Sequence, residues 1–567
     1  MSEKADNALN LALEIPQEQL MKSQGLQAGF QEETDIWELI IRYTGSLDEI
    51  REINGVTIRE LSNGYAILNV PQDKIDEIVQ NEAIIFIEKP MALEFNILNG
   101  KRVSCINEVQ QTFPGTNQQG LFGEGVIVGI ADSGINYTHG AFRNQDGTTR
   151  ILELWDQTTD TIFTEEEINR ALVSENPYEI VNSRDISGHG THVAGIAAGN
   201  FAENKNNNLG IATKSRLLIV KMAVPTENSF PRTTQLMEAV DYMIKAAQRY
   251  RMPLSINLSF GNSYGSHDGT SLLSTYLDSM ADGRRVVISV GTGNEGSGAG
   301  HTGGNISENP DTELQVSRFQ KAFSVQLWKN YADLFRVQII APSGFTIEIP
   351  QIYNKASKFV MDNTNVYVFY GTPKPYSIYQ EIFIELIPAD SYVQSGIWTF
   401  RLIPEKIVTG RFDMWLPGSG AINENTAFLR PDPYITLTVP STSSKVISVG
   451  AYNSSNDTMA SFSGRGFTRE TNQIKPDIVA PGVNISSASN TGGMEIRSGT
   501  SMATPFVAGS AALMMEWGIV RGNDMFLYGQ KLKSFLIRGA RELPGFTQWP
   551  NPQAGWGALC LRDSLPG

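Results

Sequence analysis

Three side chains in this sequence have the chemistry of a nucleophile, a general base and the carboxylate that orients such a base. Asp132 follows the apolar run GVIVGIA, His189 lies among glycines in SGHGTHVAG, and Ser501 lies in GTSMATP, where an apolar helical run begins. A serine hydroxyl is a weak nucleophile near neutral pH and needs an adjacent base. Histidine is the usual base, and a buried carboxylate fixes its tautomer and stabilises the imidazolium that forms. These residue types predict acyl transfer at Ser501 if the fold brings them together.

The segments around these residues have the pattern of an open α/β sheet. The runs GVIVGIAD, RLLIVKMAV and RRVVISVGTGN are continuously apolar, as expected of parallel strands that are covered on both faces. A long amphipathic helix is predicted in TTQLMEAVDYMIKAAQRY. Ligands of such sheets bind beyond the carboxyl ends of the strands. We therefore expect Asp132, His189 and Ser501 at one edge of the same sheet.

Two further units are expected beside this sheet. Residues 36–97 show the order strand, helix, strand, strand, helix, strand, which predicts a ferredoxin-like βαββαβ unit after a polar extension at residues 1–35. Between residues 311 and 432, short alternating strands separated by Gly, Pro, Asn and Asp predict an inserted β-sandwich, jelly-roll-like in type. The α/β domain is then divided into residues 98–310 and residues 433–567.

The composition excludes several classes of partner. The chain has 567 residues and a formal net charge of −15, without a Lys/Arg-rich run, so nucleic acid and anionic membrane surfaces are not expected as main partners. The N-terminus lacks the basic start and apolar run of a secretory signal, and no apolar run is long enough for a membrane span. These features predict a cytoplasmic protein. For Cys105 and Cys560 we expect two unpaired thiols in a reducing compartment, with pairing to each other as the alternative.

Four short motifs together resemble the subtilisin-like serine proteases, the subtilases. They are ADSGI, GHGTHVAG, VGTGNEG and GTSMATP, and their chain order Asp, His, Ser distinguishes this family from other folds with the same three residues. The resemblance implies that Asp132 orients His189, that His189 is general base and acid, and that Ser501 attacks the scissile carbonyl. It also implies an oxyanion hole made by the Asn294 amide and the backbone N–H of Ser501.

The same resemblance implies where a protein or peptide substrate binds. Two uncharged segments would form the walls of the pocket for the residue before the cut; they are Ser259, Phe260 and Gly261, and Gly291, Thr292 and Gly293. A bound peptide would add to the first wall as an extra strand. Phe260 has an alternative interpretation as plain packing.

No metal site and no other cofactor is predicted. His139, His267 and His301 have no carboxylate or cysteine cluster at the spacing of metal ligands. His192 follows His189 by three positions in the expected helix and is interpreted as a structural histidine.

The N-terminal unit and the insertion narrow the resemblance. A βαββαβ unit ahead of a subtilase domain is similar to a propeptide that assists folding and occupies the cleft, with self-cleavage expected between Phe95 and Lys101. The run WELIIRY, the segment INLSFGNSYGSHDG and a β-sandwich between the Asn294 and Ser501 motifs extend the resemblance over the chain from Trp37 onward. Together they resemble the clostridial Csp germination proteases, which implies a zymogen that is packaged in spores and activates the pro-form of a spore cortex hydrolase. The alternatives are a prodomain that is never inhibitory, a regulatory protein whose prodomain stays in the cleft, and a processing peptidase unrelated to spores.

Overall fold

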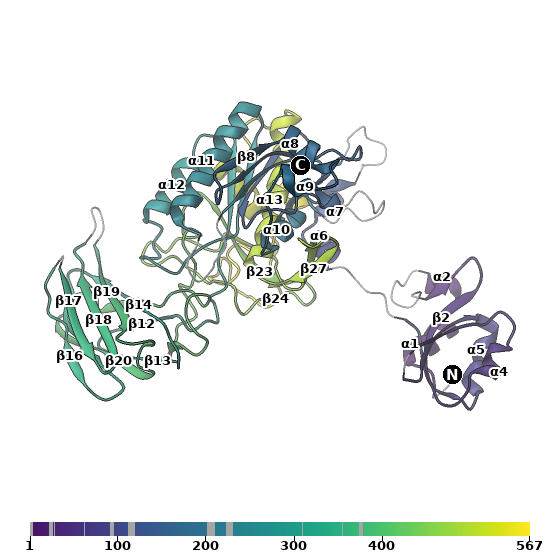
Figure 1. The fold of residues 1–567 in the computed structure, drawn as a ribbon, viewed down its shortest axis with the longest axis horizontal. Coiled ribbons are helices and arrows are strands. Elements are labelled where there is room, and N and C mark those ends of the chain that lie inside the picture. Colours follow the sequence, from purple (N-terminus) through teal and green to yellow (C-terminus); the bar gives the residue numbers. More distant parts are fainter. Residues whose placement is uncertain are drawn as a thin grey trace. The chain divides into compact units, whose positions relative to one another are not determined.

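A computed structural model describes most of the chain, and it contains two compact units, residues 1–94 and residues 95–567 (Figure 1). The described residues are 4–21, 27, 29–61, 63–90, 96–111, 120–200, 210–222, 231–308, 310–353, 355–373 and 378–566.

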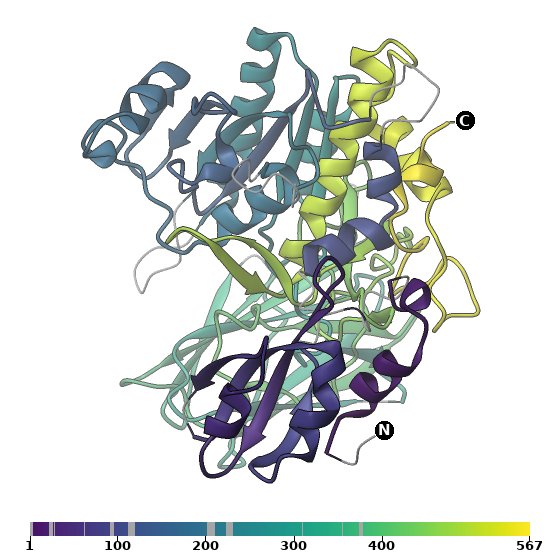
Figure 2. The ribbon, with the colours of Figure 1, turned by 90° about the vertical axis from the view of Figure 1, so that its right-hand side faces the viewer.

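The N-terminal unit is an antiparallel sheet with helices packed on one face (Figure 2, purple). β2 lies between β4 and β5, and β3 pairs with the far side of β4. Alternate residues of β2, namely Trp37, Leu39 and Ile41, are fully buried against the helices. The order of elements is the predicted βαββαβ: β2 (Ile36–Tyr43), α4 (Asp48–Arg51), β3 (Thr57–Leu61), β4 (Tyr65–Pro71), α5 (Ile75–Gln80) and β5 (Ile84–Glu88).

The segment that we expected to be a polar extension contributes to this same core. It contains α1 (Asn7–Glu14), α2 (Gln17–Leu20) and β1 (Phe30–Gln31), which pairs with β2. Leu9 and Ala12 of α1 are buried in the hydrophobic cluster of the sheet, and Ala5 forms a bridge with Ile87. The apolar spacing of α1 thus serves to dock the helix.

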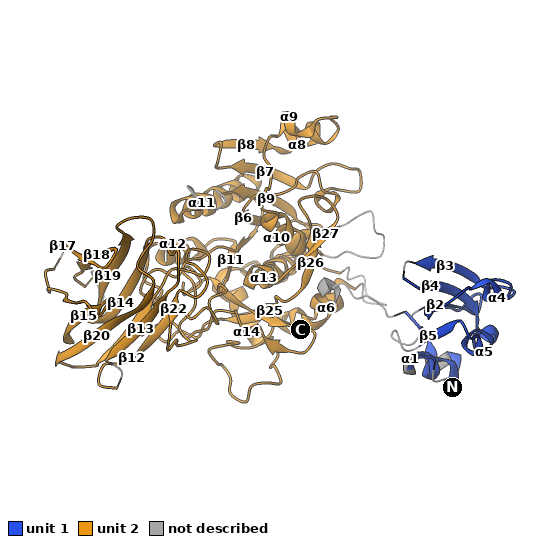
Figure 3. Ribbon diagram, turned by 60° about the horizontal axis from the view of Figure 1, so that its bottom comes forward, with its two compact units in different colours: residues 1–94 blue, residues 95–567 orange. Residues whose placement is uncertain are grey.

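The second unit is built on a nine-stranded sheet (Figure 3, orange). Its central strands are parallel, as predicted, whereas β8 and β24 at the edges pair antiparallel with their neighbours. The order is β24-β23-β11-β10-β6-β9-β7-β8, and β25 pairs with β23. The strands are β6 (Ile127–Asp132), β7 (Ile151–Asp156), β8 (Thr161–Thr164), β9 (Arg216–Lys221), β10 (Leu254–Leu258), β11 (Val286–Gly291), β23 (Ile447–Asn453), β24 (Thr458–Met459) and β25 (Ile478–Pro481).

Helices cover both faces of this sheet, which explains why its strands are apolar at every position. Val128 and Ile130 of β6 pack in the cluster with α10 and α13, and Ile127 and Ala131 pack on the other side with α11 and α12. The helices are α8 (Glu165–Leu172), α9 (Pro177–Ile180), α10 (His189–Ala198), α11 (Thr233–Tyr250), α12 (Leu272–Ala281), α13 (Thr500–Met515) and α14 (Gly529–Arg538).

The helix that begins with α13 runs to Val520. Among the described residues it alone has the length and hydropathy of a membrane span. Of its most apolar window, 89% is buried inside the protein, as in the core helix of a globular fold.

Two antiparallel sheets interrupt the α/β sheet between β11 and β23. They share one hydrophobic cluster, to which alternate residues of most of their strands contribute. The first strand begins at His301, ten residues before the predicted start of the insertion. One sheet comprises β12 (His301–Asn305), β21 (Arg411–Trp415), β14 (Phe323–Asn330), β19 (Tyr379–Pro388), β18 (Thr364–Tyr370) and β17 (Ala356–Met361); the other comprises β16 (Thr346–Glu348), β15 (Leu334–Ile340), β20 (Gly396–Lys406), β13 (Asp311–Val316) and β22 (Ala427–Phe428).

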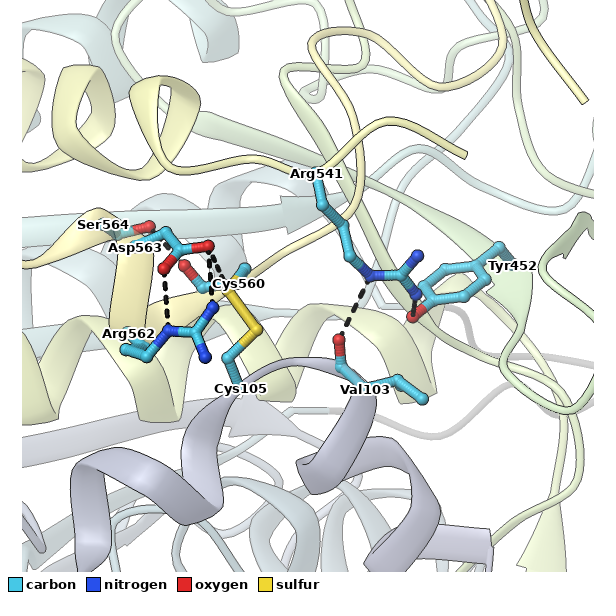
Figure 4. The surroundings of a disulfide bond; sticks show 8 residues. All are labelled: Val103, Cys105, Tyr452, Arg541, Cys560, Arg562, Asp563 and Ser564. Carbon is cyan, nitrogen blue, oxygen red and sulfur yellow. Dashed lines mark hydrogen bonds and ion pairs between the residues drawn. A yellow bond between two sulfur atoms is a disulfide. The ribbon is translucent and has the colours of Figure 1, made fainter. Parts of the chain in front are cut away.

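Cys105 and Cys560 form a disulfide bond, so the expectation of two unpaired thiols is wrong (Figure 4). Cys105 lies between α6 (Asn96–Val103) and α7 (Ile106–Gln110), and Cys560 precedes α15 (Leu561–Ser564). The Leu561 N–H donates to the Ser104 carbonyl (2.9 Å), which holds the two segments side by side. Cys105, Cys560 and Asp563 are also the one group in the described chain with the spacing of metal ligands, and the disulfide engages both of its sulfur atoms.

Candidate active site

Asp132 and His189 come from different elements and are in direct contact. Asp132 is the last residue of β6 and its side chain is fully buried; His189 is the first residue of α10. His189 Nδ1 lies 2.6 Å from Asp132 Oδ1, which also accepts a hydrogen bond from the Ser133 N–H (2.8 Å). The His189 side chain is 23% exposed. The carboxylate is therefore shielded from water while the imidazole keeps an accessible edge.

Burial and the neighbouring carboxylate act in opposite directions on His189. Burial lowers the pKa of His189, but the charge of Asp132 and the hydrogen bond to it together outweigh burial, and the net pKa is raised. Arg497 lowers it and Asp185 raises it, each to a smaller extent. The site thus stabilises the imidazolium form of His189. A general base needs this stabilisation, because it becomes an imidazolium when it accepts a proton during the reaction.

The glycines of the two motifs permit this contact. A Cβ atom on Gly190 would lie only 2.1 Å from the carbonyl oxygen of Gly134, so the turn after β6 approaches the first turn of α10 as closely as glycine allows. Gly188, which precedes His189, has a φ of +74°, a conformation that other residues rarely adopt.

Ser501 lies in the first turn of α13, next to the segment that follows β10. Its Oγ donates to the Ser259 carbonyl (3.3 Å), and the Ser259 hydroxyl donates to the Ser501 carbonyl (3.4 Å). The ring of the adjacent Phe260 lies 6.2 Å from the ring of His189, measured between centroids. Ser501 and His189 are thus brought to the same segment, Ser259-Phe260, with the serine hydroxyl directed to the backbone in this state.

Asn294 is held in position by the residue before Ser501. Its Oδ1 accepts hydrogen bonds from the N–H of Thr500 (3.0 Å) and from the Thr500 hydroxyl (3.3 Å). Asn294 is exposed, and its Nδ2 has no hydrogen-bond partner within the described part of the chain. Asn294 Nδ2 can therefore donate a hydrogen bond to a substrate atom next to Ser501.

Family models match both units of the chain. The subtilase family model matches residues 123–337 and 432–557, together more than half of the chain. The chain belongs to the subtilase family. A second model, the Csp protease B prodomain, matches residues 3–91 of this subtilase. The stretch between the two subtilase matches, residues 338–431, begins within β15 and includes strands β16 to β22 of the inserted sheets.

Individual relatives agree with this assignment. Among solved structures, the subtilase is similar to the CspB protease of Clostridium perfringens, with 38% identity and a TM-score of 0.77 over 82% of this chain and 96% of that chain. It is 45% identical to serine protease AprX of Bacillus subtilis over 155 residues, 23% of this chain and 32% of AprX. It is 25% identical to the PII-type proteinase of Lactococcus lactis subsp. cremoris, over 72% of this chain and 23% of the proteinase. The chain thus spans between about a quarter and a third of these two curated relatives.

The predicted pocket walls follow two neighbouring parallel strands of the subtilase sheet. Ser259, Phe260 and Gly261 continue from β10, and Gly291 ends β11. The side chain of Thr292 is fully buried, and its hydroxyl faces Ser463 Oγ (3.5 Å). Only the backbone of Thr292 can line a pocket. Phe260 is half-buried against the core, in accord with its interpretation as packing, although its ring also lies close to His189.

Sequence reasoning missed Asp185, which holds the two motifs together. Its carboxylate accepts from the Ser133 hydroxyl (2.8 Å), the Gly188 N–H (2.9 Å) and both the N–H and the hydroxyl of Thr191 (2.8 and 2.6 Å). The sequence feature that could have pointed to Asp185 is its position, a carboxylate four residues before His189. Asp185 is therefore a positioning residue for the end of β6 and the start of α10.

His192 occupies the core, as its structural interpretation predicts. It is fully buried, and its Nε2 lies 3.0 Å from the Ile485 carbonyl and 3.2 Å from the Glu495 carbonyl. Burial lowers the pKa of His192 to about 4. His192 is therefore neutral at the pH at which His189 titrates.

Proposed function

We propose that this subtilase is a serine endopeptidase that cleaves peptide bonds through an acyl-enzyme at Ser501. The observation that carries the proposal is the 2.6 Å contact between His189 Nδ1 and the fully buried Asp132. His189 Nε2 would take the Ser501 proton as Oγ bonds to the substrate carbonyl carbon, and then give it to the departing amine as the C–N bond breaks. Water, deprotonated by the same imidazole, would then release the new carboxyl terminus and free the serine.

Ser501 has to turn before it can react. Its hydroxyl donates to the Ser259 carbonyl, and a rotation about χ1 would redirect it toward His189. Catalytic hydrogen bonds are often long or misaligned in free enzymes and tighten when substrate binds. A peptide that pairs with the Ser259–Gly261 segment would compete for the Ser259 carbonyl and so favour the reactive rotamer.

A serine-directed fluorophosphonate tests this proposal directly. Labelling of the chain, followed by peptide mapping, should place one adduct on Ser501. Ser498→Ala is the matched control, because Ser498 is exposed and lies three residues away. Folded protein that does not label, after removal of the N-terminal unit as well as before, would refute the proposal.

The Nδ2 group of the Asn294 amide would stabilise the oxyanion of the tetrahedral intermediate. We expect Asn294→Ala to lower kcat about 10²–10³-fold with little change in KM, the loss known for one such donor in subtilisin. Peptide hydrolysis measured against substrate concentration separates the two constants. Asn305→Ala on β12 is the control for loss of an amide elsewhere. An unchanged kcat for Asn294→Ala would exclude Asn294 from the oxyanion hole.

The raised pKa of His189 predicts the acid side of the pH profile. Because a general base must be neutral, activity falls as pH decreases through this pKa, and the midpoint in kcat/KM should lie above about 6.5, the ordinary value for histidine. Asp132→Asn removes the charge that raises the pKa, so burial dominates and the midpoint moves down, with kcat reduced about 10⁴-fold. A wild-type midpoint below the ordinary value would contradict this account.

We infer that residues 1–94 act as a propeptide and that the chain is made as a self-processing zymogen. The match to the Csp protease B prodomain over residues 3–91 supports this. Of the expected cleavage region, Phe95 lies outside the described residues and the remainder belongs to α6. We also propose that the protein acts in germination by activating the pro-form of a cortex hydrolase, and that it is cytoplasmic and packaged in spores. Its similarity to the CspB protease of Clostridium perfringens supports this role.

We further propose that the inserted sheets form a jelly-roll-like domain that braces the active-site segments. Trp415 of β21 stacks between His267 and His301, with ring centroids 4.3 and 4.7 Å away. Gln326 of β14 accepts from the Gly265 N–H (2.9 Å), close to the Ser259–Gly261 wall.

Removal of the Trp415 ring tests the bracing role. Trp415→Ala should lower the free energy of unfolding by about 3 kcal/mol, because it leaves a cavity between two buried rings. Urea denaturation measures the change. Phe369→Ala, at an exposed site on β18 of the same sheet, is the control. Equal effects of the two substitutions would contradict the bracing role.

A further inference from the structure

A third segment lies between the two proposed pocket walls and is hydrogen-bonded to both. The Thr438 N–H donates to the Thr292 carbonyl (2.9 Å) on one side. On the other side Asn262 and Val439 exchange two backbone hydrogen bonds (2.9 and 2.8 Å). Thr438 is therefore fixed in position by its own backbone, midway between the walls.

The side chain of Thr438 fills the space between one glycine of each wall. A Cβ atom on Gly261 would lie 2.5 Å from Thr438 Oγ1, and a Cβ atom on Gly293 would lie 2.3 Å from Thr438 Cγ2. Both glycines thus face the threonine, which is only 6% exposed. Any side chain that entered between the walls would meet this methyl group and this hydroxyl before it had gone deep.

The Thr438 hydroxyl is buried, and its Oγ1 makes no hydrogen bond within the described part of the chain. A buried hydroxyl without a partner costs free energy that a bound hydrogen-bonding group would recover. The neighbouring wall residues carry no charge, so a charged side chain would find no counter-ion there.

We propose that Thr438 selects the residue before the scissile bond, and that it favours a short uncharged side chain with a hydrogen-bonding end, such as asparagine or serine. The filled space disfavours phenylalanine and other large side chains, and the unpartnered hydroxyl disfavours apolar side chains of the same shape as asparagine. This inference rests on the proposed peptidase function, in which Gly261 and Gly293 belong to the pocket walls.

A pair of substitutions separates the two effects of Thr438. Thr438→Val keeps the shape and removes the hydroxyl, and because Oγ1 has no partner among the described residues the variant should fold at least as stably as the wild type. Thr438→Gly opens the space between the walls. Thr436→Val is the control, since Thr436 lies two residues earlier and its hydroxyl already donates to the Pro433 carbonyl (3.0 Å).

The test measures kcat/KM on peptides that differ only in the residue before the cut: asparagine, its isostere leucine, phenylalanine or lysine. For the wild type and Thr436→Val we expect asparagine to exceed leucine by about tenfold or more, because an isostere leaves the hydroxyl unpaired. Thr438→Val should bring this ratio close to one, and Thr438→Gly should raise cleavage after phenylalanine at least tenfold. A wild-type preference for phenylalanine, leucine or lysine, or an asparagine preference that survives in Thr438→Val, would overturn the inference.

Labelling of Ser501 by fluorophosphonate distinguishes failure of this inference from failure of the proposed function. Protein that labels and hydrolyses peptides without the expected preference remains a peptidase, and only the role of Thr438 is lost. Protein that neither labels nor hydrolyses any of the peptides overturns both.

Discussion

Ser501→Ala should reduce kcat/KM for peptide hydrolysis by about 10⁴–10⁶-fold, the largest effect expected of any single substitution in this chain. The proposed acyl-enzyme forms on Ser501 Oγ, which is hydrogen-bonded to the Ser259-Phe260 segment that approaches His189. Ser501 also follows Thr500, whose N–H donates to Asn294. Folding should be unaffected, since within the described residues Oγ makes one hydrogen bond, of 3.3 Å, to the Ser259 carbonyl. A fluorogenic peptide assay on matched, fully folded samples measures the loss.

Two further variants show whether the loss of activity in Ser501→Ala is specific to the catalytic serine. Ser498→Ala removes an exposed hydroxyl from the same segment and should retain wild-type kcat/KM. His189→Ala in the Ser501→Ala background should cause little further loss, because residues that act as one catalytic unit are not additive. A Ser501→Ala variant with more than about a tenth of wild-type activity would contradict the acyl-enzyme mechanism, since loss of such a nucleophile costs orders of magnitude.

Loss of the Cys105–Cys560 disulfide should lower the free energy of unfolding by about 5 kcal/mol. The two cysteines are 455 residues apart, so the bond closes nearly the whole second unit into one loop and restricts the unfolded chain strongly. It also ties the start of this unit to its end, where Arg541 Nε donates to the Val103 carbonyl (3.2 Å) (Figure 4). Denaturant unfolding of the Cys105→Ser, Cys560→Ser double variant beside oxidised wild type measures the difference.

Reduction supplies the control for the disulfide. A thiol reductant should shift the wild-type unfolding midpoint toward that of the double variant and leave the double variant unchanged. An oxidised wild type no more stable than the double variant would show that the bond carries no stability. The bond also bears on the proposed cytoplasmic location, because the cytosol keeps most cysteine pairs reduced. Retention of the disulfide in freshly isolated protein would therefore favour an oxidising environment.

Features specified by contiguous residues could be predicted from the sequence. The apolar strand that ends at Asp132 and the glycines around His189 determine local backbone geometry, so both residues were expected at one sheet edge and are found in contact. The βαββαβ order was predicted for the same reason, because each of its elements has its own periodicity.

Features that depend on distant segments could not be predicted in this way. The disulfide joins residues 455 positions apart, and the spacing of two cysteines says nothing of their separation in space. The contact of His301 is another case, because its Nε2 lies 3.3 Å from Asp413 Oδ1, and Asp413 arrives on a strand 112 residues later. Thr438 belongs to no motif, and its place between Gly261 and Gly293 becomes evident only when three segments are assembled.

The most direct test of the account is the intact mass and N-terminal sequence of purified wild-type protein beside Ser501→Ala. We expect the wild type to be cut between Phe95 and Lys101 and Ser501→Ala to stay whole, because the chain processes itself through Ser501. Wild type and variant that are cut at the same position, or that both remain uncut, would contradict self-processing by this serine.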